Sequence, residues 1–383
     1  MKYDNSIINR NLSKSTALYF LVICALIALV LEFSHPEPLL IFIFAAIGLI
    51  PLAKLIGQST EHLATHYGPT AASLLNVTFG NAAELIIGIV AMFAGLLSLV
   101  KASIIGSIIG NILLIFGLSL IVGGLKQKEQ FFNKENTGYQ SSMLFLAIIG
   151  LAVPTILAIT TEVGHQGDIQ FISDILAFVL LGVYIASIIF TFVTHKYLFA
   201  IPSMQIDEEN GERRNEDSIN SKDVDVERAQ HWSKKKSILL LGASIIGVVL
   251  VSEVLVSSVE VLIKRFGFGE MFVGAIIVGI VGNAAEHSSA IMLARRGKLD
   301  LAIGIAAGSG TQVAIFVVPI LVIAGIIVNR HFNLVFTIYE LAVVFLAALI
   351  LNLIAHDGKS NWFEGIMLTA VYIIVAVGFF FIR

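Results

Sequence analysis

The stretch Gly80-Asn81-Ala82-Ala83-Glu84 occurs a second time as Gly282-Asn283-Ala284-Ala285-Glu286, 202 residues later in the chain. The same offset pairs Gly106-Ser107 with Gly308-Ser309. Upstream, Glu61 and Glu260 each precede a glycine by seven residues, at an offset of 199. Apolar segments of similar composition can match by chance. Three matched pairs in the same order and at nearly the same offset indicate an internal duplication instead.

Both copies of the motif lie in a chain that is too apolar to be a soluble globular enzyme. Of its 383 residues, 57% are hydrophobic and 13% are charged, and its mean hydropathy is +0.91. Soluble domains contain about 45–50% apolar and about 25% charged residues. Eleven segments have the apolar character and approximate length of a membrane-spanning helix, which needs about 20 residues. They cover residues 16–33, 38–60, 69–97, 101–124, 139–160, 171–194, 237–263, 271–294, 299–328, 332–355 and 362–382.

The duplication divides these segments into one added helix and two units of five. We expect an all-α membrane protein with eleven transmembrane helices, in which helices 2–6 and 7–11 are the two repeats. The expected boundaries are 1–37 for the N-terminal segment and helix 1, 38–199 for the first repeat, 200–236 for an acidic cytoplasmic linker and 237–383 for the second repeat. Because five is odd, the second unit enters the membrane from the opposite side. Such inverted repeats are typical of transporters with a site near the bilayer midplane.

Lysine and arginine favour one side of the predicted membrane protein. With the N-terminus inside, the inner segments hold 19 of these residues and the outer segments hold 5. Cytoplasmic loops carry such an excess, so the bias supports both the helix count and the direction. The short N-terminal region favours a bacterial cell membrane, with an organelle membrane as the alternative. The net charge of −3 gives no reason to expect a nucleic-acid partner.

The glutamates of the repeated motif lie deep inside apolar segments, where a charge costs at least about 2.5–3.5 kcal/mol. Each follows an asparagine by three residues, so a carboxylate and an amide share one helix face. Two such faces, with glycine carbonyls where the helices break, offer the all-oxygen cage that suits Ca²⁺, and two glutamates balance its charge. The alternative is a neutral or paired glutamate that only joins helices. The predicted metal ligands are Glu84, Glu286, Asn81, Asn283, Gly80 and Gly282.

The same carboxylates predict H⁺ as the counter-ion of Ca²⁺. Removal of Ca²⁺ leaves two like charges in a site of low dielectric constant, and protons can neutralise them. Ca²⁺ and H⁺ then compete for the same oxygens, and exchange results if only the loaded site can change the side to which it opens. His287 is rotated by about 100° from Glu286 around the helix, so we expect it to pack rather than to bind the ion.

Polar residues in the third helix of each unit are expected to support the site. Ser107 and Asn111 are four residues apart, and Ser309 and Gln312 are three apart, so each pair shares a helix face. They either orient the glutamates or hold a water molecule. Ordinary polar contact between helices is the alternative.

Two groups of acidic residues lie outside the predicted membrane core. Glu61 and Glu260 stand near helix ends, where they either draw cations into the pathway or are solvated helix termini. The linker is either a solvated connection or a regulatory strip that binds cations weakly, because it lacks the calcium-loop pattern. The candidate regulatory residues are Asp207, Glu208, Glu209, Glu212, Glu216 and Asp217.

Two other function classes fit parts of this pattern. A cation channel would also need repeated deep carboxylates, and flux that saturates and requires a counter-ion distinguishes an exchanger from it. An intramembrane hydrolase needs a nucleophile and a base, yet no His-Glu-x-x-His stretch occurs and Ser309 lacks a clear histidine partner within the membrane. We therefore expect a transporter that is not an enzyme. A homo-oligomer is left open.

The repeated segments resemble the Ca²⁺/H⁺ antiporter family of the cation/Ca²⁺ exchanger superfamily. The similar stretches are Gly80-Asn81-Ala82-Ala83-Glu84-Leu85-Ile86, Gly282-Asn283-Ala284-Ala285-Glu286-His287, Gly106-Ser107-Ile108-Ile109-Gly110-Asn111 and Gly308-Ser309-Gly310-Thr311-Gln312. The resemblance spans nearly the whole chain. It implies that Glu84 and Glu286 bind Ca²⁺ and protons alternately, that Ser309 and Gln312 help to hold the site, and that the acidic linker regulates transport.

The alanines of the motif bear on the choice of counter-ion. Related Na⁺/Ca²⁺ exchangers have hydroxyl-rich, proline-containing motifs where this chain has Ala82-Ala83 and Ala284-Ala285. The loss of those oxygens favours H⁺ over Na⁺. A Na⁺-coupled exchanger, or one of broader selectivity that includes Mn²⁺, is the alternative, because the preference for Ca²⁺ rests mainly on the resemblance.

Overall fold

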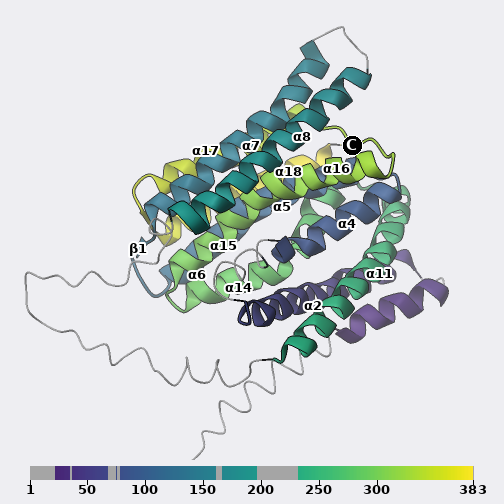
Figure 1. Ribbon diagram of the computed structural model, residues 1–383, viewed down its shortest axis with the longest axis horizontal. Helices are drawn as coiled ribbons and strands as arrows, with labels where there is room; N and C mark the ends of the chain where they lie inside the picture. Colours follow the sequence, from purple (N-terminus) through teal and green to yellow (C-terminus); the bar gives the residue numbers. More distant parts are fainter. Residues whose placement is uncertain are drawn as a thin grey trace, which may run out of the picture.

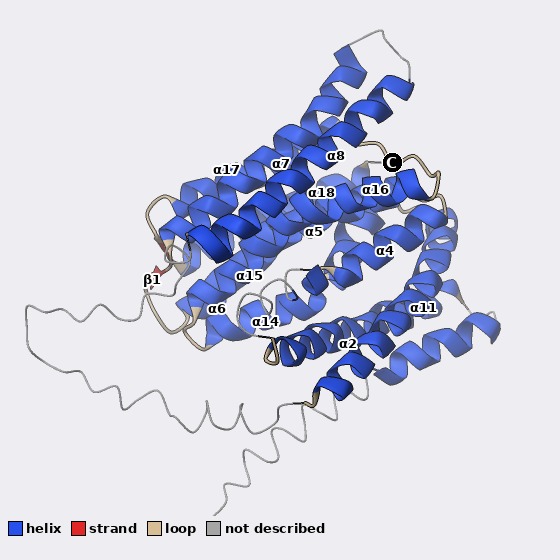
Figure 2. Cartoon of the chain, in the orientation of Figure 1, coloured by secondary structure: helices blue, strands red, loops and turns tan. Residues whose placement is uncertain are grey.

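Helices make up nearly all of the secondary structure in the computed structural model, which describes residues 22–34, 37–67, 75, 78–160, 166–195 and 232–382 (Figures 1 and 2). A helix at Val22–Ser34 comes first. The α-helices that follow are α2 (Pro38–Ala64), α4 (Ala82–Phe93), α5 (Leu97–Ile109), α6 (Phe116–Gly124), α7 (Lys134–Thr160), α8 (Gln166–Ile189), α11 (Lys234–Phe266), α12 (Glu270–Phe272), α13 (Gly279–Gly282), α14 (Ala284–Arg295), α15 (Leu299–Gln312), α16 (Val318–Ile327), α17 (Ile338–Ala355) and α18 (Trp362–Phe381). Four π-helical turns interrupt them: η1 (Gly110–Ile115), η2 (Phe190–Thr194), η4 (Val273–Val278) and η5 (Val313–Val317). The strands β1 (Gln130–Phe131) and β2 (Lys359–Ser360) pair antiparallel.

The helices of the described residues have the lengths and composition of membrane spans. Eight are long and apolar enough to cross a bilayer, or nine if Glu270–Gly282 and Ala284–Arg295 form one bent span. Two shorter apolar helices, Val22–Ser34 and Ala82–Phe93, lie in the first and third predicted segments. An all-α membrane architecture is thus confirmed. The count of eleven, the domain boundaries and the inversion of the repeats stay predictions.

The predicted helix at 332–355 was wrong at its beginning. α17 begins at Ile338, and residues 330–337 are not helical. Thr337 accepts a hydrogen bond from the Glu340 backbone, while the Glu340 carboxylate accepts one from the Thr337 backbone, so this capping box fixes the start of the helix. Leu334 and Phe336 are buried although they precede it. Because Leu334 and Phe336 are apolar, the sequence analysis wrongly included them in the helix.

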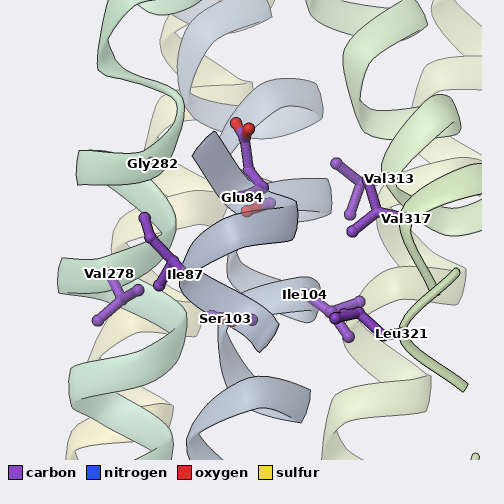
Figure 3. Close-up of a pocket in the computed structure, with 11 residues that line it drawn as sticks. Glu84, Ile87, Ser103, Ile104, Val278, Gly282, Val313, Val317 and Leu321 are labelled. Atoms are coloured by element: carbon purple, nitrogen blue, oxygen red, sulfur yellow. The ribbon is translucent and has the colours of Figure 1, made fainter. Parts of the chain in front are cut away.

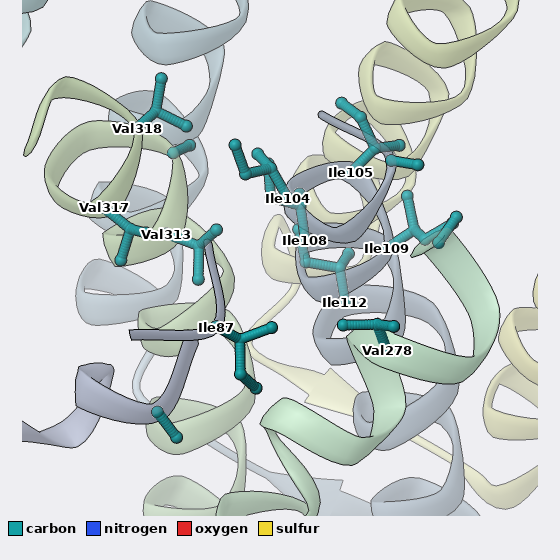
Figure 4. Close-up of a cluster of buried hydrophobic side chains, with 14 of the residues drawn as sticks. Ile87, Ile104, Ile105, Ile108, Ile109, Ile112, Val278, Val313, Val317 and Val318 are labelled. Atoms are coloured by element: carbon teal, nitrogen blue, oxygen red, sulfur yellow. The ribbon is translucent and has the colours of Figure 1, made fainter. Parts of the chain in front are cut away.

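Two long helices form the centre of the bundle. In the most apolar window of Leu97–Gly124, 83% of the residues are buried, and in that of Leu299–Ile327, 61% are, more than in the other six long spans. Figure 4 shows their isoleucine and valine side chains meeting Ile87 of α4 and Val278 of η4. Each central helix also contains a π-helical turn, η1 or η5, at nearly the same place in its half of the chain. Such turns re-aim side chains and are frequent at functional sites.

The helices α2 and α11 pack side by side along their length (Figure 1). At one end, the Arg265 guanidinium donates to both carboxylate oxygens of Glu37 at 2.5 and 3.2 Å. At the other end, the ring of His62 stacks on Trp232 at 4.4 Å, and His66 Nε2 lies 3.1 Å from the Trp232 carbonyl oxygen. The two helices, which belong to different halves of the chain, are therefore joined near both ends.

Part of the predicted linker lies outside the described residues. This applies to residues 196–231, which include all six candidate regulatory acids: Asp207, Glu208, Glu209, Glu212, Glu216 and Asp217. The structure gives no information on them, and their regulatory role stays a prediction.

Candidate cation-binding site

Both copies of the repeated motif lie at a break in a helix. Asn81 has φ −96° and ψ 21°, and Asn283 has φ −94° and ψ 3°, so the two asparagines share one non-helical backbone conformation. α4 and α14 begin directly after them. The break at Asn283 bends the helix by 61°. Glu84 and Glu286 consequently stand in the first turn of a new helix, where the helix dipole favours negative charge.

Each glutamate side chain lies against the glycine of the other motif. A Cβ atom on Gly80 would lie 3.4 Å from Glu286 Oε1. A Cβ atom on Gly282 would lie 3.4 Å from Glu84 Cγ and 3.9 Å from its Cδ. These reciprocal contacts place the two motifs face to face. Glycine at both positions leaves room beside the carboxylates for a ligand.

Three oxygens of the motifs are buried and accept no hydrogen bond from the described residues. They are Asn81 Oδ1, Glu84 Oε2 and Glu286 Oε2. A buried oxygen without a donor is costly, and a bound cation or a proton would compensate it. No group of three or more His, Cys, Asp or Glu side chains converges anywhere in the described part of the chain. Further ligands here would have to be amide, hydroxyl, backbone or water oxygens, which suit a hard cation.

Asn283 is held by a buried hydrogen-bond network. Its Nδ2 donates to Ser107 Oγ at 2.9 Å and to the Gly279 carbonyl oxygen at 3.0 Å. Its Oδ1 accepts from Asn111 Nδ2 at 3.1 Å and from Ser309 Oγ at 3.4 Å. Both polar atoms of the Asn283 amide are therefore engaged by protein groups.

Asn81 has a different environment from that of Asn283. Its Nδ2 donates to Gln312 Oε1 at 2.8 Å, whereas its Oδ1 is one of the three oxygens without a donor. In both motifs the asparagine is thus bonded to the third helix of the other half. The predicted role of Ser107, Asn111, Ser309 and Gln312 in orienting the glutamates stays a prediction. The two halves nevertheless differ, since only the Asn81 amide keeps an oxygen available.

His287 packs into the network around Asn283. It is buried, and its Nε2 lies 3.2 Å from Asn111 Oδ1. Asn111 Nδ2 in turn also donates to Ser309 Oγ at 3.2 Å. His287 thus contacts a supporting residue, as expected from its rotation away from Glu286.

A narrow pocket begins at Glu84 (Figure 3). Its other lining residues come from four helices and are largely apolar: Ile87, Gly88, Ser103, Ile104, Ser107, Val278, Gly282, Val313, Val317 and Leu321. Leu321 packs on Gly88, where a Cβ atom would lie 3.0 Å from Leu321 Cδ2. Most of these residues lie on the side of Glu84 toward the predicted outer helix ends. Apolar side chains therefore separate Glu84 from that end of the bundle.

The structure places Glu61 and Glu260 away from the motifs. Both are exposed near the C-terminal ends of α2 and α11. Glu260 accepts a hydrogen bond from Lys264 at 2.6 Å, one helical turn later. Their role in an ion pathway stays a prediction.

The chain shares its architecture and sequence with known ion exchangers. The protein family described as "Sodium/calcium exchanger protein" matches residues 37–193 and 236–381, which is most of the chain. The chain belongs to this family. With its long apolar helices, this exchanger is a multi-pass membrane protein.

Relatives of this exchanger match over almost their whole length. It is 39% identical over 371 residues to a protein of Aphanothece halophytica named "Ca(2+)/H(+) antiporter", covering 97% of this chain and 98% of that one. It is 38% identical over 366 residues to "Ca(2+)/H(+) antiporter ChaA" of Bacillus subtilis, covering 95% and 99% of the two chains. Among solved structures, that of native YfkE has a TM-score of 0.77 at 35% identity, covering 95% of this chain and 99% of that chain.

A third glutamate with a buried carboxylate oxygen, Glu340, was not identified in the sequence analysis. Glu340 is 1% exposed, and its Oε1 accepts no hydrogen bond from the described residues. Nearby, the Lys101 ammonium donates to Asn333 Oδ1 and to the Val335 carbonyl oxygen, both at 2.7 Å. These contacts hold the non-helical segment 330–337 against α5. The Thr337-x-x-Glu340 pattern of a capping box was the available signal for this arrangement.

Proposed function

We propose that this exchanger transports Ca²⁺ across a membrane in exchange for H⁺, with both ions sharing the paired carboxylates of Glu84 and Glu286. The observation that carries the proposal is the reciprocal packing of each glutamate on the glycine of the other motif, with Oε2 of both carboxylates buried and accepting no hydrogen bond within the described part of the chain. The names of the relatives support the same pair of ions.

Charge balance explains why such a site exchanges these ions. Two carboxylates neutralise one Ca²⁺, and two protons neutralise the same carboxylates when Ca²⁺ leaves. A site that crosses the membrane only in a neutral form would then move Ca²⁺ one way and H⁺ the other. The available oxygens include one amide, Asn81 Oδ1, beside the two carboxylates. Asn283 and the carbonyls of Gly80 and Gly282 remain candidate ligands, and Ser107, Asn111, Ser309 and Gln312 support them.

The architecture we propose for this mechanism has eleven helices, with an added first helix and two inverted repeats of five. The family match in two blocks, 37–193 and 236–381, supports the two halves. The matching breaks at Asn81 and Asn283 support a pseudo-symmetric site between them. We propose the cell membrane of a bacterium as its location, since relatives from Bacillus subtilis, Aphanothece halophytica and Synechocystis carry the name Ca(2+)/H(+) antiporter.

Transport by purified protein in proteoliposomes tests the proposal. A pH gradient with the acidic side inside the vesicle should drive Ca²⁺ accumulation against its concentration gradient as H⁺ leaves, while a Na⁺ gradient of the same size and direction should not. Glu84→Gln and Glu286→Gln should each abolish the accumulation, because one carboxylate cannot balance Ca²⁺. Glu129→Gln is the matched control, since Glu129 is an exposed glutamate in the loop before β1.

Three outcomes would contradict this function. Accumulation that persists in both glutamine variants would contradict the proposal that Glu84 and Glu286 bind the transported ion. Accumulation driven by a Na⁺ gradient would show that the counter-ion is Na⁺ and not H⁺. A Ca²⁺ flux that neither saturates nor needs a counter-ion would favour a channel. The same assay with Mn²⁺ measures how broad the selectivity is.

A further inference from the structure

A groove lies between the last two helices of the described chain, far from the paired glutamates in sequence. α17 and α18 follow each other, but α17 packs mainly on α7 and α18 mainly on α6. Their separation leaves a cavity of about 400 Å³ between them. It is lined by Ile350, Leu353, Ile354, Asp357, Lys359, Glu364, Met367, Leu368 and Val371. A cavity of this size falls in the range of ligand-binding sites.

The walls of the groove are apolar and open toward the membrane. Leu353 is 65% exposed and Met367 is 47% exposed, whereas Leu368 is 1% exposed and forms part of the floor. Neighbouring outward-facing side chains such as Ile374 are also apolar and exposed, as expected of a surface that meets lipid. From Glu364 to Val371 the groove follows α18 for about 10 Å, at 1.5 Å per residue. Hydrocarbon, rather than a soluble metabolite, has access to such walls.

The mouth of the groove carries charge. Lys359 of β2 is exposed, and no carboxylate of the described residues lies within ion-pairing distance of it. The nearby carboxylate of Glu364 is already bonded, accepting from Ser360 Oγ at 2.5 Å and from Asn361 Nδ2 at 3.1 Å. Asp357 is the opposing charge, and it faces His356 Nδ1 at 3.8 Å. Lys359 is therefore the group at this mouth that is available to an anion.

More positive charge lies beside Lys359. A Cβ atom on Gly358 would lie 3.2 Å from Lys134 Cβ, so Lys134 adjoins the same turn. The pairing of β1 with β2 also brings the loop of Lys126 and Lys128 to this end of the bundle. This end is the predicted inner side, where anionic lipid headgroups attract basic residues. Trp362 is 48% exposed at the same level and suits the membrane–water interface.

We infer that the groove between α17 and α18 binds one anionic phospholipid, with an acyl chain along Leu353 and Met367 and the headgroup phosphate at Lys359. A zwitterionic lipid would place its chain in the same groove but gain less at Lys359. The inference concerns a site distant from Glu84 and Glu286, and it stands whether or not the transported ions are those proposed above.

Quenching of tryptophan fluorescence by brominated lipid tests the site directly. The chain contains two tryptophans, so a Trp232→Phe variant leaves Trp362 as the reporter. In nanodiscs of phosphatidylcholine with a small fraction of brominated lipid, brominated phosphatidylglycerol should quench Trp362 more strongly than brominated phosphatidylcholine. Lys359→Gln in this background should make the two lipids equal. Lys54→Gln, at an exposed lysine of α2 on the predicted inner side and away from the groove, is the control and should keep the difference.

A second pair of variants tests the groove rather than the charge. Leu353→Phe with Met367→Phe fills the space between the helices and should weaken quenching by both lipids. Leu346→Phe with Ile374→Phe adds the same rings to exposed positions on the same helices outside the groove, and should leave quenching unchanged. Native mass spectrometry of the detergent-purified proteins should find one retained phosphatidylglycerol, lost in the filled variant.

Several results would overturn the inference. One is a phosphatidylglycerol preference that survives Lys359→Gln, and another is quenching that is the same in the filled and control pairs. If the filled variant changes the oligomer mass without changing bound lipid, the groove receives a second copy of the chain instead. Thermal unfolding of each variant checks that it is folded, so a loss of quenching in a folded protein is decisive.

Discussion

The two motif asparagines occupy equivalent places in the sequence but make different hydrogen bonds. The Asn283 side chain bonds with Ser107, Asn111 and Ser309, while the Asn81 side chain donates to Gln312 and its Oδ1 accepts no hydrogen bond from the described residues. The physical difference is that an engaged amide holds helices together, whereas an available oxygen can bind an ion. The two residues should therefore respond differently to the same substitution.

We expect Asn283→Ala to reduce stability and Asn81→Ala to reduce Ca²⁺ affinity. Removal of the Asn283 amide leaves buried partners unpaired, which costs about 1–3 kcal/mol. Removal of the Asn81 amide takes away a buried oxygen of the same motif that accepts no hydrogen bond from the described residues. Thermal unfolding with and without Ca²⁺ separates the effects: Asn283→Ala should unfold at a lower temperature without Ca²⁺, and Asn81→Ala should lose most of the Ca²⁺-induced shift. Equal losses in both variants would contradict the difference between the halves.

The shared carboxylates also predict how Ca²⁺ binding depends on pH. Protons occupy the same oxygens as Ca²⁺, so acidification should weaken Ca²⁺ binding, and binding should release protons. Where the Ca²⁺-free carboxylates are both protonated, the release should approach two protons per Ca²⁺. Calorimetry in buffers of different ionisation enthalpy measures this number. Binding that is independent of pH, with no proton release, would contradict competition at one site.

Among the elements, α5 and η4 pack closely enough to require glycine at position 106. A Cβ atom on Gly106 of α5 would lie 1.9 Å from the Ala275 carbonyl oxygen in η4. The backbone itself blocks the position, so the two helices can be this close only with glycine there. This contact joins the third helix of the first half to the broken helix of the second.

Gly106→Ala should force α5 and η4 apart and destabilise the protein. Overpacking of a tight contact costs typically about 1–3 kcal/mol, and here the obstacle is backbone that cannot rotate away. Gly110→Ala is the matched control, because a Cβ atom at Gly110 meets no atom within 4 Å. The melting temperature in detergent should fall for Gly106→Ala and stay unchanged for Gly110→Ala. Equal melting temperatures would show that the helices adjust.

The segment before α17 shows why an apolar stretch need not be helical. Side chains from three different helices hold residues 330–337. Lys101 Nζ donates to the Val335 carbonyl oxygen. Thr155 Oγ1 accepts from the Phe336 backbone N–H at 2.9 Å, and Ser173 Oγ accepts from the Leu334 backbone N–H at 3.0 Å. Buried backbone N–H and C=O groups need hydrogen-bond partners, and in this segment these side chains provide partners that a helix would otherwise provide.

For the whole molecule, the distribution of basic residues predicts which end faces the cytoplasm. Lys128 and Arg330 are both exposed, but they lie in loops assigned to opposite sides. The single native cysteine, Cys24, is buried in the structure. Its replacement would leave introduced cysteines as the reporters of orientation.

In a Cys24→Ala background, a membrane-impermeant thiol reagent should label Arg330→Cys in intact cells. Lys128→Cys should react only after the membrane is permeabilised, because the predicted inner loops carry the basic excess. The reverse labelling pattern would show that the orientation is opposite to the predicted one. Labelling of both introduced cysteines in intact cells would contradict an odd number of spans between the two loops.

Hydropathy, residue spacing and repetition were sufficient for one part of this account. They predicted an all-α membrane protein, the repeated carboxylates of the Gly-Asn-Ala-Ala-Glu motifs, and the helix faces that carry Ser107, Asn111, Ser309 and Gln312. These properties depend on neighbouring residues along one helix, so a sequence displays them directly. The family match and the antiporter relatives agree with that interpretation.

Contacts between distant segments were decided only by tertiary structure. Asn81 and Asn283 occupy the same position in the repeated motif, but Asn283 bonds with Asn111 whereas Asn81 bonds with Gln312. The burial of Glu340, the non-helical course of 330–337 and the groove between α17 and α18 likewise depend on which helices pack together. Packing joins residues that are far apart along the chain, such as Asn81 and Gln312 at a separation of 231 positions. Local sequence patterns do not identify such partners.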